Sequence, residues 1–489
     1  MEAVHPFRAF RVVSRLSCSN PFRGLTFLFV QDKPPLFARQ PGEWVGAIGG
    51  RSVLEADVTV VAGLFDGFEN VREVDFAKAR GLASRRVANL EVTRRLAGPG
   101  VAILPVVKAD AYGHGMLPIA RILAGAGADG LSVATLDEAI ELRDRGITAP
   151  IIVMFPIPPD AATVAASRSI AVAAGEPAAV DAILEAATSA GLAGELNVEL
   201  EVETGLGRGG APLDAVVDVA RRIGAAGARL SGVWSHLQEA EVAELTEDQV
   251  ARFEEALSRL TAAGVAVPRR HIAASAAILL GTVPRYDAVR PGLMTYGLVP
   301  DELAAAGIGL DDLPPAVREL RPVMSLHARP VRVADLPEGH GVSYGPTWRA
   351  SRPSRIATLP LGYGDGWPRS LSNRAEALVR GIRVPLVGNV AMDAVMADVT
   401  DVPGAPVTTS DEFVLLGRQG GQEISAAELA RSRTTNSWEV VTAMSSRLTR
   451  VYHAPAGPGP VLSLASVEER WLGSNSGMEM SATSRSTRS

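Results

Sequence analysis

The stretch VAILPVVKADAYGHG, residues 101–115, joins an apolar run to a lysine, a tyrosine and two glycines. Its first part, VAILPVVK at 101–108, has the length and the β-branched content of a buried strand. Lys108 stands at the carboxyl end of that strand. In a parallel barrel this end faces the active site, so we expect Lys108 to point into a site rather than into solvent.

Seven further runs of this kind follow before residue 298. They are DGLSVAT (129–135), PIIVMF (150–155), SIAVAAG (169–175), LNVELEVE (196–203), RLSGVWSH (229–236), RHIAASAA (270–277) and AVRPGLMTYG (288–297). The segments between them, such as LDEAIELRDRG at 136–146, repeat apolar residues every three to four positions and end in glycine, as helices do. Eight strands that alternate with helices predict an α/β fold, a (β/α)8 TIM-type barrel over residues 73–318. An open, doubly wound sheet is the alternative.

The pattern changes at about residue 319, where short runs such as EFVLLGRQG (412–420) alternate with Pro and Gly. Helical periodicity largely disappears, which predicts a separate C-terminal all-β domain over 319–455. Residues 456–489 are mostly small and polar and predict a flexible tail. Residues 1–72 show no pattern to which we can assign an element. We interpret them as a disordered extension or an artefact of the start site.

The composition excludes several classes of protein. With 47% hydrophobic residues, the 489-residue chain can bury a large core. Its net charge of −6 and dispersed Lys and Arg lack the basic patch of a nucleic-acid-binding protein. Its one cysteine, Cys18, can build neither a disulfide framework nor a thiolate metal site, and we expect no metal. The longest N-terminal apolar run, 25–30, is far below the ~20 residues of a membrane span, so we expect a cytoplasmic protein.

Two features indicate the chemistry. A lysine desolvated at the position of Lys108 has a lowered pKa and can condense with an aldehyde cofactor. Barrels commonly hold phosphate in the loops after strands seven and eight, where Ser275 and the pair Gly292 and Leu293 stand. Taken alone, Ser275 is equally well explained as a small core residue.

The decamer VVKADAYGHG, 106–115, resembles the pyridoxal-phosphate attachment motif of alanine racemases. The resemblance extends from about Glu73 to Tyr452. It implies a homodimer in which the β domain of the partner subunit covers each barrel mouth. It also implies a racemase that interconverts L- and D-alanine for peptidoglycan, with Lys108 and Tyr344, in GHGVSYGPTW, as the two acid/base groups.

The resemblance also implies roles for residues around the cofactor. The phosphate would be bound by Tyr112, Ser275, Gly292 and Leu293. Arg290 would face the pyridine nitrogen, and His236, in GVWSH, would link Tyr344 to Arg290. Because arginine keeps its proton, the ring nitrogen would stay unprotonated, which favours racemisation over transamination.

The substrate would be bound by Arg208, in ETGLGRGG, and by the backbone amide of Met392, in NVAMDAVMADV. Both would reach its carboxylate. Tyr363, Asp365 and Asp393 would support the site, as would Glu201.

The chain departs from the family at three positions. Glu201 replaces a lysine that is often carbamylated, and our hypothesis is that its carboxylate holds Arg208 directly. Trp438, in TTNSWEV, replaces a tyrosine that contacts the phosphate, which leaves that contact open because indole donates but does not accept. Ala391 replaces a frequent cysteine and enlarges the pocket, so a broader substrate range stays open.

Two alternatives remain from the sequence. One is a broad-specificity racemase for serine or basic amino acids, since pocket residues set that choice. The other is a non-catalytic barrel that only binds pyridoxal phosphate; such proteins lack the second domain, and Tyr344 and Met392 argue against it. A decarboxylase on the related barrel is less favoured, because its β-domain signature is missing from the sequence.

Overall fold

The computed structural model describes residues 57–62 and 85–453. Its first sheet has eight parallel strands: β2 (Ala102–Ile103), β3 (Leu131–Val133), β4 (Ile151–Val153), β5 (Ala171–Ala174), β6 (Asn197–Glu201), β7 (Arg229–Trp234), β8 (Arg270–His271) and β9 (Ala288–Val289). Their order is β2-β9-β8-β7-β6-β5-β4-β3. A parallel bridge between Val106 and Ser132 joins the β2 segment to β3 and closes the ring. The predicted barrel is therefore confirmed, and the open sheet is excluded.

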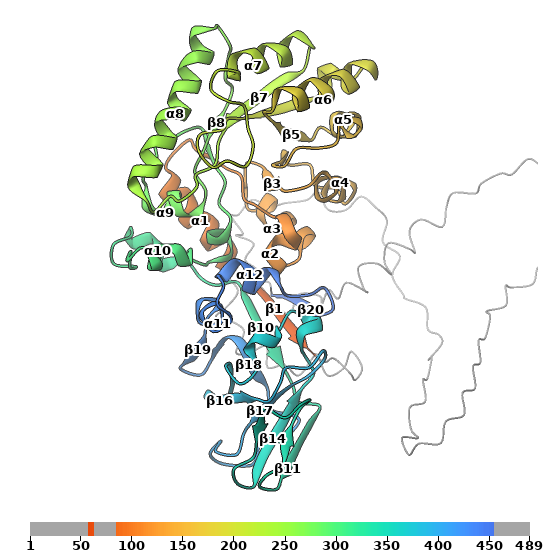
Figure 1. Ribbon diagram of the computed structural model, residues 1–489, viewed down its shortest axis with the longest axis vertical. Coiled ribbons are helices and arrows are strands. Elements are labelled where there is room, and N and C mark those ends of the chain that lie inside the picture. The colour runs from red at the N-terminus through yellow and green to blue at the C-terminus, as the bar shows by residue number, and fades with distance from the viewer. Residues whose placement is uncertain (1–56, 63–84, 454–489) are drawn as a thin grey trace, which may run out of the picture. The chain divides into compact units, whose positions relative to one another are not determined.

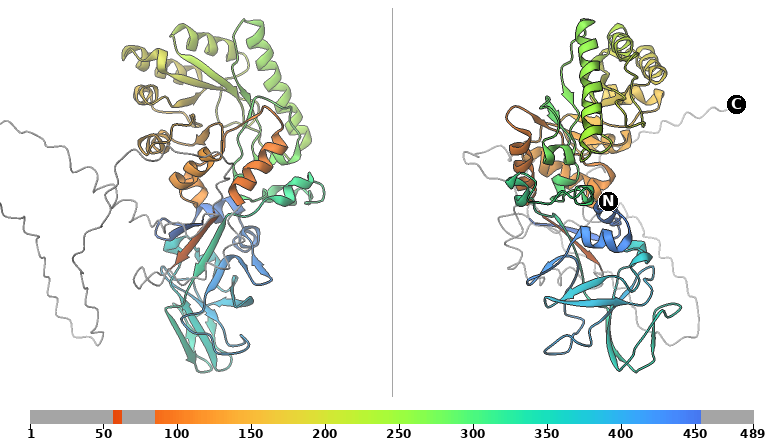
Figure 2. Two further views of the ribbon diagram at one scale, coloured as in Figure 1. Left: turned by 180° about the vertical axis from the view of Figure 1, so that it is seen from behind. Right: turned by 60° about the vertical axis from the view of Figure 1, so that its left-hand side comes forward.

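Helices connect these strands and cover their outer side (Figure 1). They are α1 (Arg85–Ala97), α2 (Lys108–Gly113), α3 (Met116–Gly125), α4 (Leu136–Asp144), α5 (Ala162–Ser167), α6 (Pro177–Ser189), α7 (Val216–Ala225), α8 (Ala243–Ala262), α9 (Ser275–Leu280) and α10 (Asp301–Ala305). Both views in Figure 2 show the long helix α8, in green, outside the strands. Helix α4 begins where Thr135 and Glu138 form a reciprocal capping box. None of the helices in the described ranges has the length and apolarity needed to cross a membrane.

The second sheet forms the β domain. Its strands are β1 (Asp57–Ala62), β10 (Met324–Ala328), β11 (Arg332–Leu336), β14 (Ser354–Leu359), β15 (Glu376–Val379), β16 (Ile382–Val387), β17 (Val395–Asp398), β18 (Phe413–Gln419), β19 (Gln422–Ile424) and β20 (Thr449–His453). A separate hairpin pairs β12 (Gly341–Val342) with β13 (Trp348–Arg349). The strands are antiparallel except for the β1–β10 pair. The predicted β domain is confirmed, and it also contains the short helices α11 (Ala426–Arg433) and α12 (Ser437–Thr442).

Strand β1 lies within residues 1–72, where the sequence leads us to assign no element. It pairs with β10 on one side and with β20 on the other. Both partners lie more than 250 residues away in the chain, so no local turn signal marks the strand. Our predictions for the rest of residues 1–72, apart from 57–62, and for the tail at 456–489 lie outside the described residues.

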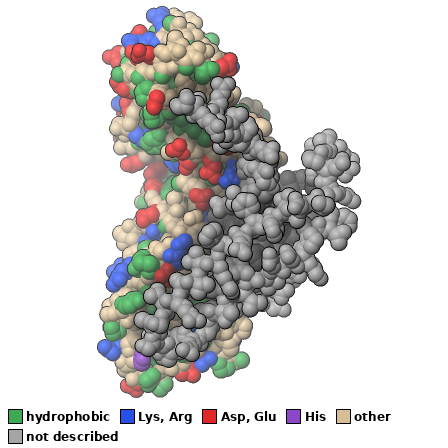
Figure 3. Space-filling model, turned by 90° about the vertical axis from the view of Figure 1, so that its right-hand side faces the viewer, with side chains coloured by type: hydrophobic (Ala, Val, Ile, Leu, Met, Phe, Trp, Pro, Cys, Tyr) green, Lys and Arg blue, Asp and Glu red, His purple; other side chains and the backbone are tan. Residues whose placement is uncertain are grey.

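Short 3-10 turns complete the connections: η3 (Pro159–Ala161), η4 (Ala193–Glu195), η5 (Leu293–Tyr296), η6 (Pro315–Glu319), η7 (Tyr363–Asp365) and η8 (Arg369–Leu371). Over the described part of one face, acidic and basic side chains are interspersed (Figure 3). That surface has the mixed character of an ordinary globular protein rather than a single-sign patch.

The turn that follows Lys108 has an unusual backbone. Residues 109–112 all have φ between 52° and 54°, in the left-handed region. This conformation costs L-residues roughly 1–2 kcal/mol each. Four in succession persist only where the surrounding structure enforces the conformation.

Strand β20 of the β domain supplies that enforcement. The buried Arg450 donates from Nε to the carbonyl oxygen of Gly113 at 2.9 Å and pairs with Asp110 at 3.1 Å. Tyr452 donates its hydroxyl to the carbonyl oxygen of His114 at 2.9 Å. A Cβ at Gly115 would lie 1.9 Å from that hydroxyl oxygen, so only glycine permits the approach. The β domain thus holds the turn that carries Lys108.

We predict that Arg450→Met destabilises the protein by about 2–4 kcal/mol, because it leaves buried carbonyl groups without a donor and releases the strained turn. Urea unfolding measures the effect. Arg418→Met is the matched control, because Arg418 also belongs to the β domain but forms an exposed pair with Glu423. That control should change stability by less than about 0.5 kcal/mol. Equal effects of the two substitutions would contradict the role of Arg450 in holding the turn after Lys108.

Candidate active site

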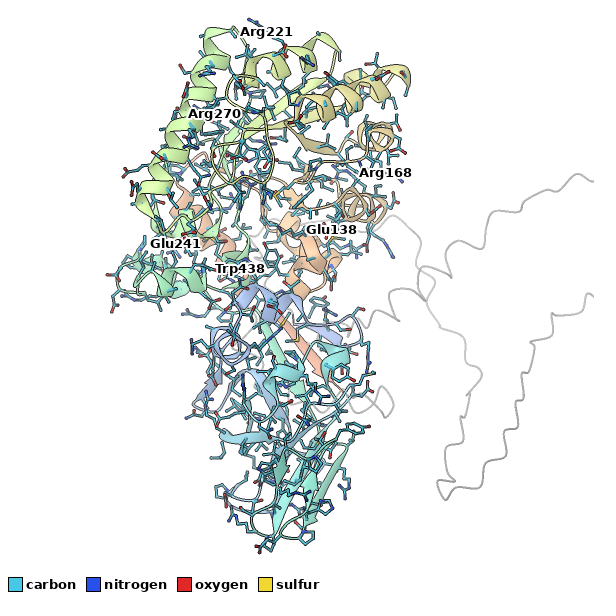
Figure 4. The ribbon with its side chains drawn as sticks, viewed as in Figure 1. Glu138, Arg168, Arg221, Glu241, Arg270 and Trp438 are labelled. Carbon is cyan, nitrogen blue, oxygen red and sulfur yellow. The ribbon has the colours of Figure 1, made fainter. Side chains whose placement is uncertain are left out.

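A cavity of about 880 Å³ lies at the carboxyl ends of the barrel strands. It brings together all the residues that the sequence analysis assigns to cofactor binding: Lys108, Tyr112, His236, Ser275, Arg290, Gly292 and Leu293. Trp438, at the beginning of α12, lines the same cavity (Figure 4). The predicted residues Arg208, Glu201, Tyr344, Met392, Tyr363, Asp365 and Asp393 are not among the described residues that line it.

The amine of Lys108 is held in a setting that favours its neutral form. Burial lowers its pKa, and the positive charge of Arg208 lowers it further, while the Glu138 carboxylate opposes both. Glu138, labelled in Figure 4, also accepts a hydrogen bond from the backbone N–H of Ala109 at 2.6 Å. An amine with a lowered pKa is both a better nucleophile and a better proton acceptor near neutral pH.

Arg290 is a fully buried guanidinium at the base of the cavity. It donates from Nη1 to Nδ1 of His271 at 2.5 Å and from Nη2 to the carbonyl oxygen of Ser235 at 2.7 Å. Its Nε has no hydrogen-bond partner among the described residues. Burial lowers the pKa of Arg290 to about 10, so the group still keeps its charge at neutral pH. The site therefore presents a charged, partly unsatisfied donor.

His236 contacts Arg290 and is neutral. Its Nδ1 lies 3.2 Å from Nη2 of Arg290. Burial and the positive charges of Arg290 and Arg208 lower the pKa of His236 to about 3. Since arginine can only donate, Nδ1 must accept, and the ring proton of His236 sits on Nε2. Gln249 of α8 fixes the segment by donating to the carbonyl oxygen of His236 at 3.1 Å.

Hydroxyl and amide groups gather at another part of the cavity. The Ser275 hydroxyl oxygen accepts hydrogen bonds from the backbone N–H groups of Gly292 at 2.9 Å and Met294 at 3.3 Å. A Cβ at residue 292 would lie 2.8 Å from the hydroxyl oxygen of Tyr112, so glycine keeps this space open. Burial raises the pKa of Tyr112, which keeps its hydroxyl protonated and able to donate. Such a group of donors suits an anion.

Glu201 and Arg208 form a pair above the end of β6. One Glu201 oxygen lies 3.4 Å from Nη2 of Arg208. Burial raises the pKa of Glu201, and the neighbouring Arg208 opposes that rise. The guanidinium also lies 5.5 Å from the ring centroid of Phe155. The loop therefore holds a cation that is partly exposed and whose position depends on a buried carboxylate.

A second group of predicted residues lies on the β domain, and we call Tyr344, Tyr363 and Met392 the Tyr344 face. Their exposed fractions are 75%, 44% and 51%, which is high for large hydrophobic side chains. One backbone and one side-chain hydrogen bond join their segments. Gly364 donates to the carbonyl oxygen of Met392 at 3.0 Å, and the Asn389 side chain donates to that of Tyr344 at 2.8 Å.

The two predicted aspartates support this face rather than form part of it. Arg447 pairs with Asp365 at 3.1 Å and with Asp393 at 2.6 Å. Asp365 is buried and accepts the backbone N–H of Gly362 at 2.9 Å. It thereby fixes the turn that presents Tyr363.

Sequence reasoning missed several residues that position the site, namely Glu199, Gln249, His271, Arg450 and Tyr452. His271 carried a usable signal, because a titratable residue directly precedes the apolar run IAASAA. Arg450 and Tyr452 carried none, because their partners lie more than 330 positions earlier in the chain.

Two family models match the chain. The alanine racemase N-terminal domain matches residues 84–300, and the alanine racemase C-terminal domain matches residues 323–452. Among curated proteins, the alanine racemase of Halothermothrix orenii is 36% identical over 76% of this chain and 94% of its own length. That of Symbiobacterium thermophilum is 39% identical over 75% of this chain and 94% of its own.

Solved structures agree with the sequence matches. Alanine racemase from Streptomyces coelicolor A3(2) is similar with a TM-score of 0.68 and 33% identity, covering 80% of this chain and 96% of that one. The Bacillus anthracis alanine racemase with bound L-Ala-P has a TM-score of 0.67 and 32% identity, covering 81% and 95%. The barrel, the β domain and the matches across both show that this chain belongs to the alanine racemase family.

Proposed function

We propose that the chain interconverts L- and D-alanine with pyridoxal 5'-phosphate bound to Lys108, and thereby supplies D-alanine for peptidoglycan. The observation that carries this proposal is the cavity itself. It combines an amine of lowered pKa, Lys108, with a buried guanidinium, Arg290, whose Nε donor is unpaired among the described residues.

The residues of the cavity fit this cofactor. The unpaired Nε of Arg290 is a suitable donor for an aromatic ring nitrogen that carries no proton. Tyr112, Ser275, Gly292 and Leu293 would hold the phosphate, beside Trp438. When bound, the cofactor delocalises the negative charge that develops at the substrate Cα.

Racemisation needs a proton removed from one face of Cα and returned to the other. Lys108 would hold or accept the proton at Nζ on one side, and Tyr344 would do so at its phenolic oxygen on the other. His236, with its proton on Nε2, can donate to that phenolic oxygen and stabilise its ionised form. Arg208, held by Glu201, would bind the substrate carboxylate together with the backbone amide of Met392.

The second acid/base group would come from another copy of the chain. Tyr344 and Met392 belong to the exposed Tyr344 face, and neither is among the described residues that line the cavity of Lys108. Two copies related by a twofold axis would place the Tyr344 face of each against the cavity of the other. The exposed hydrophobic residues of that face support such an interface.

We predict that Lys108→Ala and Tyr344→Phe are each inactive alone but regain activity when mixed under conditions of subunit exchange. A mixed dimer would contain one intact site, built from Lys108 of one chain and Tyr344 of the other. At equal concentrations the statistical limit is roughly a quarter of the wild-type activity. The measurement is racemisation of L-alanine after exchange.

Mixing Lys108→Ala with a second variant of the same cavity, Arg290→Leu, is the control. Both substitutions then fall on one side of the shared site. Each mixed dimer then has one cavity without Lys108 and one without Arg290, so no site is intact and activity should not return. Mixing Tyr344→Phe with Met392→Pro is the matching control on the Tyr344 face. Each site of that mixed dimer again keeps one defect, so activity should not return. No recovery in the Lys108→Ala and Tyr344→Phe mixture, despite proven exchange, would refute the shared site.

We predict that the enzyme exchanges the Cα proton of L-alanine in deuterium oxide faster than those of L-serine and L-arginine. Ala391 lies beside Met392 and enlarges the pocket, so some exchange of L-serine is compatible with the proposal. Mass spectrometry of the recovered amino acids measures the rates. Faster exchange of L-serine or L-arginine would favour the broad-specificity racemase, and no exchange with bound cofactor would favour a non-catalytic barrel.

We predict that Glu201→Gln raises KM for alanine about three- to tenfold, the order of 1 kcal/mol that a partly buried charged hydrogen bond contributes, with a smaller change in kcat. The reason is that Arg208 would lose its anionic partner. Glu195→Gln, which removes an exposed pair with Arg229, is the control and should leave KM unchanged. An unaltered KM in Glu201→Gln would count against direct support of Arg208.

A further inference from the structure

A carboxylate that the mechanism above does not use lies inside the barrel. Glu199, in the middle of β6, is completely buried. One of its oxygens accepts hydrogen bonds from Nη2 of Arg269 at 2.6 Å and from the hydroxyl of Ser231 at 3.0 Å. The other lies 3.0 Å from Nε2 of His271. Every contact of this carboxylate is therefore with a donor or a titratable ring.

The neighbouring strand is shaped to admit the Glu199 carboxylate. A Cβ at Gly232, on β7, would lie 2.2 Å from the Glu199 oxygen that faces His271. The pairing of β6 with β7 also shifts register between Val198 and Glu199. Any larger residue at 232 would displace the carboxylate from His271. The contact between Glu199 and His271 therefore depends on glycine at position 232 of the neighbouring strand.

The contacts on both sides of His271 determine where its proton lies. Nη1 of Arg290 is 2.5 Å from Nδ1 of His271. Arginine has no acceptor, so Nδ1 must accept, which requires an imidazole with its proton on Nε2. That proton points at Glu199. Burial and the charge of Arg290 lower the pKa of His271 to about 4 despite the carboxylate, which agrees with a neutral ring.

We propose that Glu199 is a positioning residue: it fixes His271 in the Nε2–H tautomer, so that Nδ1 holds Arg290 in place at the wall of the cavity. The inference about His271 stands on the contacts alone. Its consequence for catalysis rests on the proposed function. With the wrong tautomer, an N–H of His271 would face an N–H of Arg290, and the guanidinium would move.

Glu199→Gln tests the proposal because glutamine cannot satisfy all three donors. If its NH2 group faces His271, the ring must carry its proton on Nδ1, against Arg290. If the NH2 group faces Arg269 instead, two donors meet there. The double substitution Glu199→Gln with Arg269→Gln relieves this conflict, because the amide oxygen of residue 269 can accept from residue 199. The double variant should therefore restore the Nε2–H tautomer that the single variant loses.

The tautomer is measured directly on cofactor-free protein labelled with ¹⁵N-histidine. Long-range ¹H–¹⁵N spectra distinguish Nδ1–H from Nε2–H in each of the seven histidines. The His271 signal is assigned by its loss in His271→Gln. We expect Nε2–H in the wild type and in Arg269→Gln, its partial or full loss in Glu199→Gln, and its return in the double variant.

Activity of the loaded enzyme provides the second readout. We expect Glu199→Gln to lower kcat of racemisation about tenfold, the scale of losing a supporting hydrogen bond of a catalytic group, and to raise the share of transamination. The double variant should recover most of that loss, which a merely destabilised protein would not do.

Each outcome separates the two proposals. Nδ1–H in the wild type, or Nε2–H retained in folded Glu199→Gln, overturns the role of Glu199. If Arg269→Gln alone changes the His271 tautomer to the same extent, the tautomer depends on the Arg269–Glu199 ion pair, and the proposed role of Glu199 is likewise overturned. If the tautomers change as expected but no variant racemises alanine, the positioning role stands and the proposed function fails. If Glu199→Gln does not fold, the wild type and Arg269→Gln still decide between the two tautomers.

Discussion

The site depends most on the hydrogen bond and ion pair by which Arg450 holds the left-handed turn after Lys108. Four consecutive L-residues adopt a conformation that each would avoid in isolation. Lys108 begins that turn and Tyr112 ends its strained part, so the amine and the hydroxyl reach one cavity from a single short segment. Because β20 supplies the restraint, the β domain contributes to the barrel's own active site within one chain.

Positive charges gather near the cavity, and two carboxylates of the barrel interior partly balance them. The positive charge of Arg208 lowers the pKa of both Lys108 and Arg290, so these cations repel one another. Glu201 and Glu199, at alternate positions of strand β6, oppose this effect at Arg290. The balance allows Arg290 to remain charged while His236 and His271 remain neutral. Neutral rings have one donor and one acceptor each, and this is what gives the hydrogen bonds around Arg290 a direction.

Strand runs and helix periodicity predicted the barrel and the β domain because these signals are local, and the resemblance of VVKADAYGHG pointed to residues that line one cavity. The sequence did not single out Glu199, because the alternation of acidic and apolar residues in LNVELEVE is typical of a strand with one solvent face. In the closed ring both faces are buried, so the acidic face lines the interior. The contacts of Arg450, Tyr452 and β1 join distant parts of the chain, and no local pattern encodes them.

The residues of the proposed site belong to two parts of the fold, the barrel and the exposed Tyr344 face of the β domain. The residues that line the cavity lie just beyond the ends of the barrel strands, where buried hydrogen bonds fix Arg290 and Ser275. Tyr344 and Met392, which we propose to meet the substrate, lie on the exposed Tyr344 face, next to Ala391. A substitution at Ala391 would alter the pocket without removing a charge near Arg290. Substrate range could therefore change at Ala391 while Lys108 and Tyr344, the groups proposed to act at Cα, are retained.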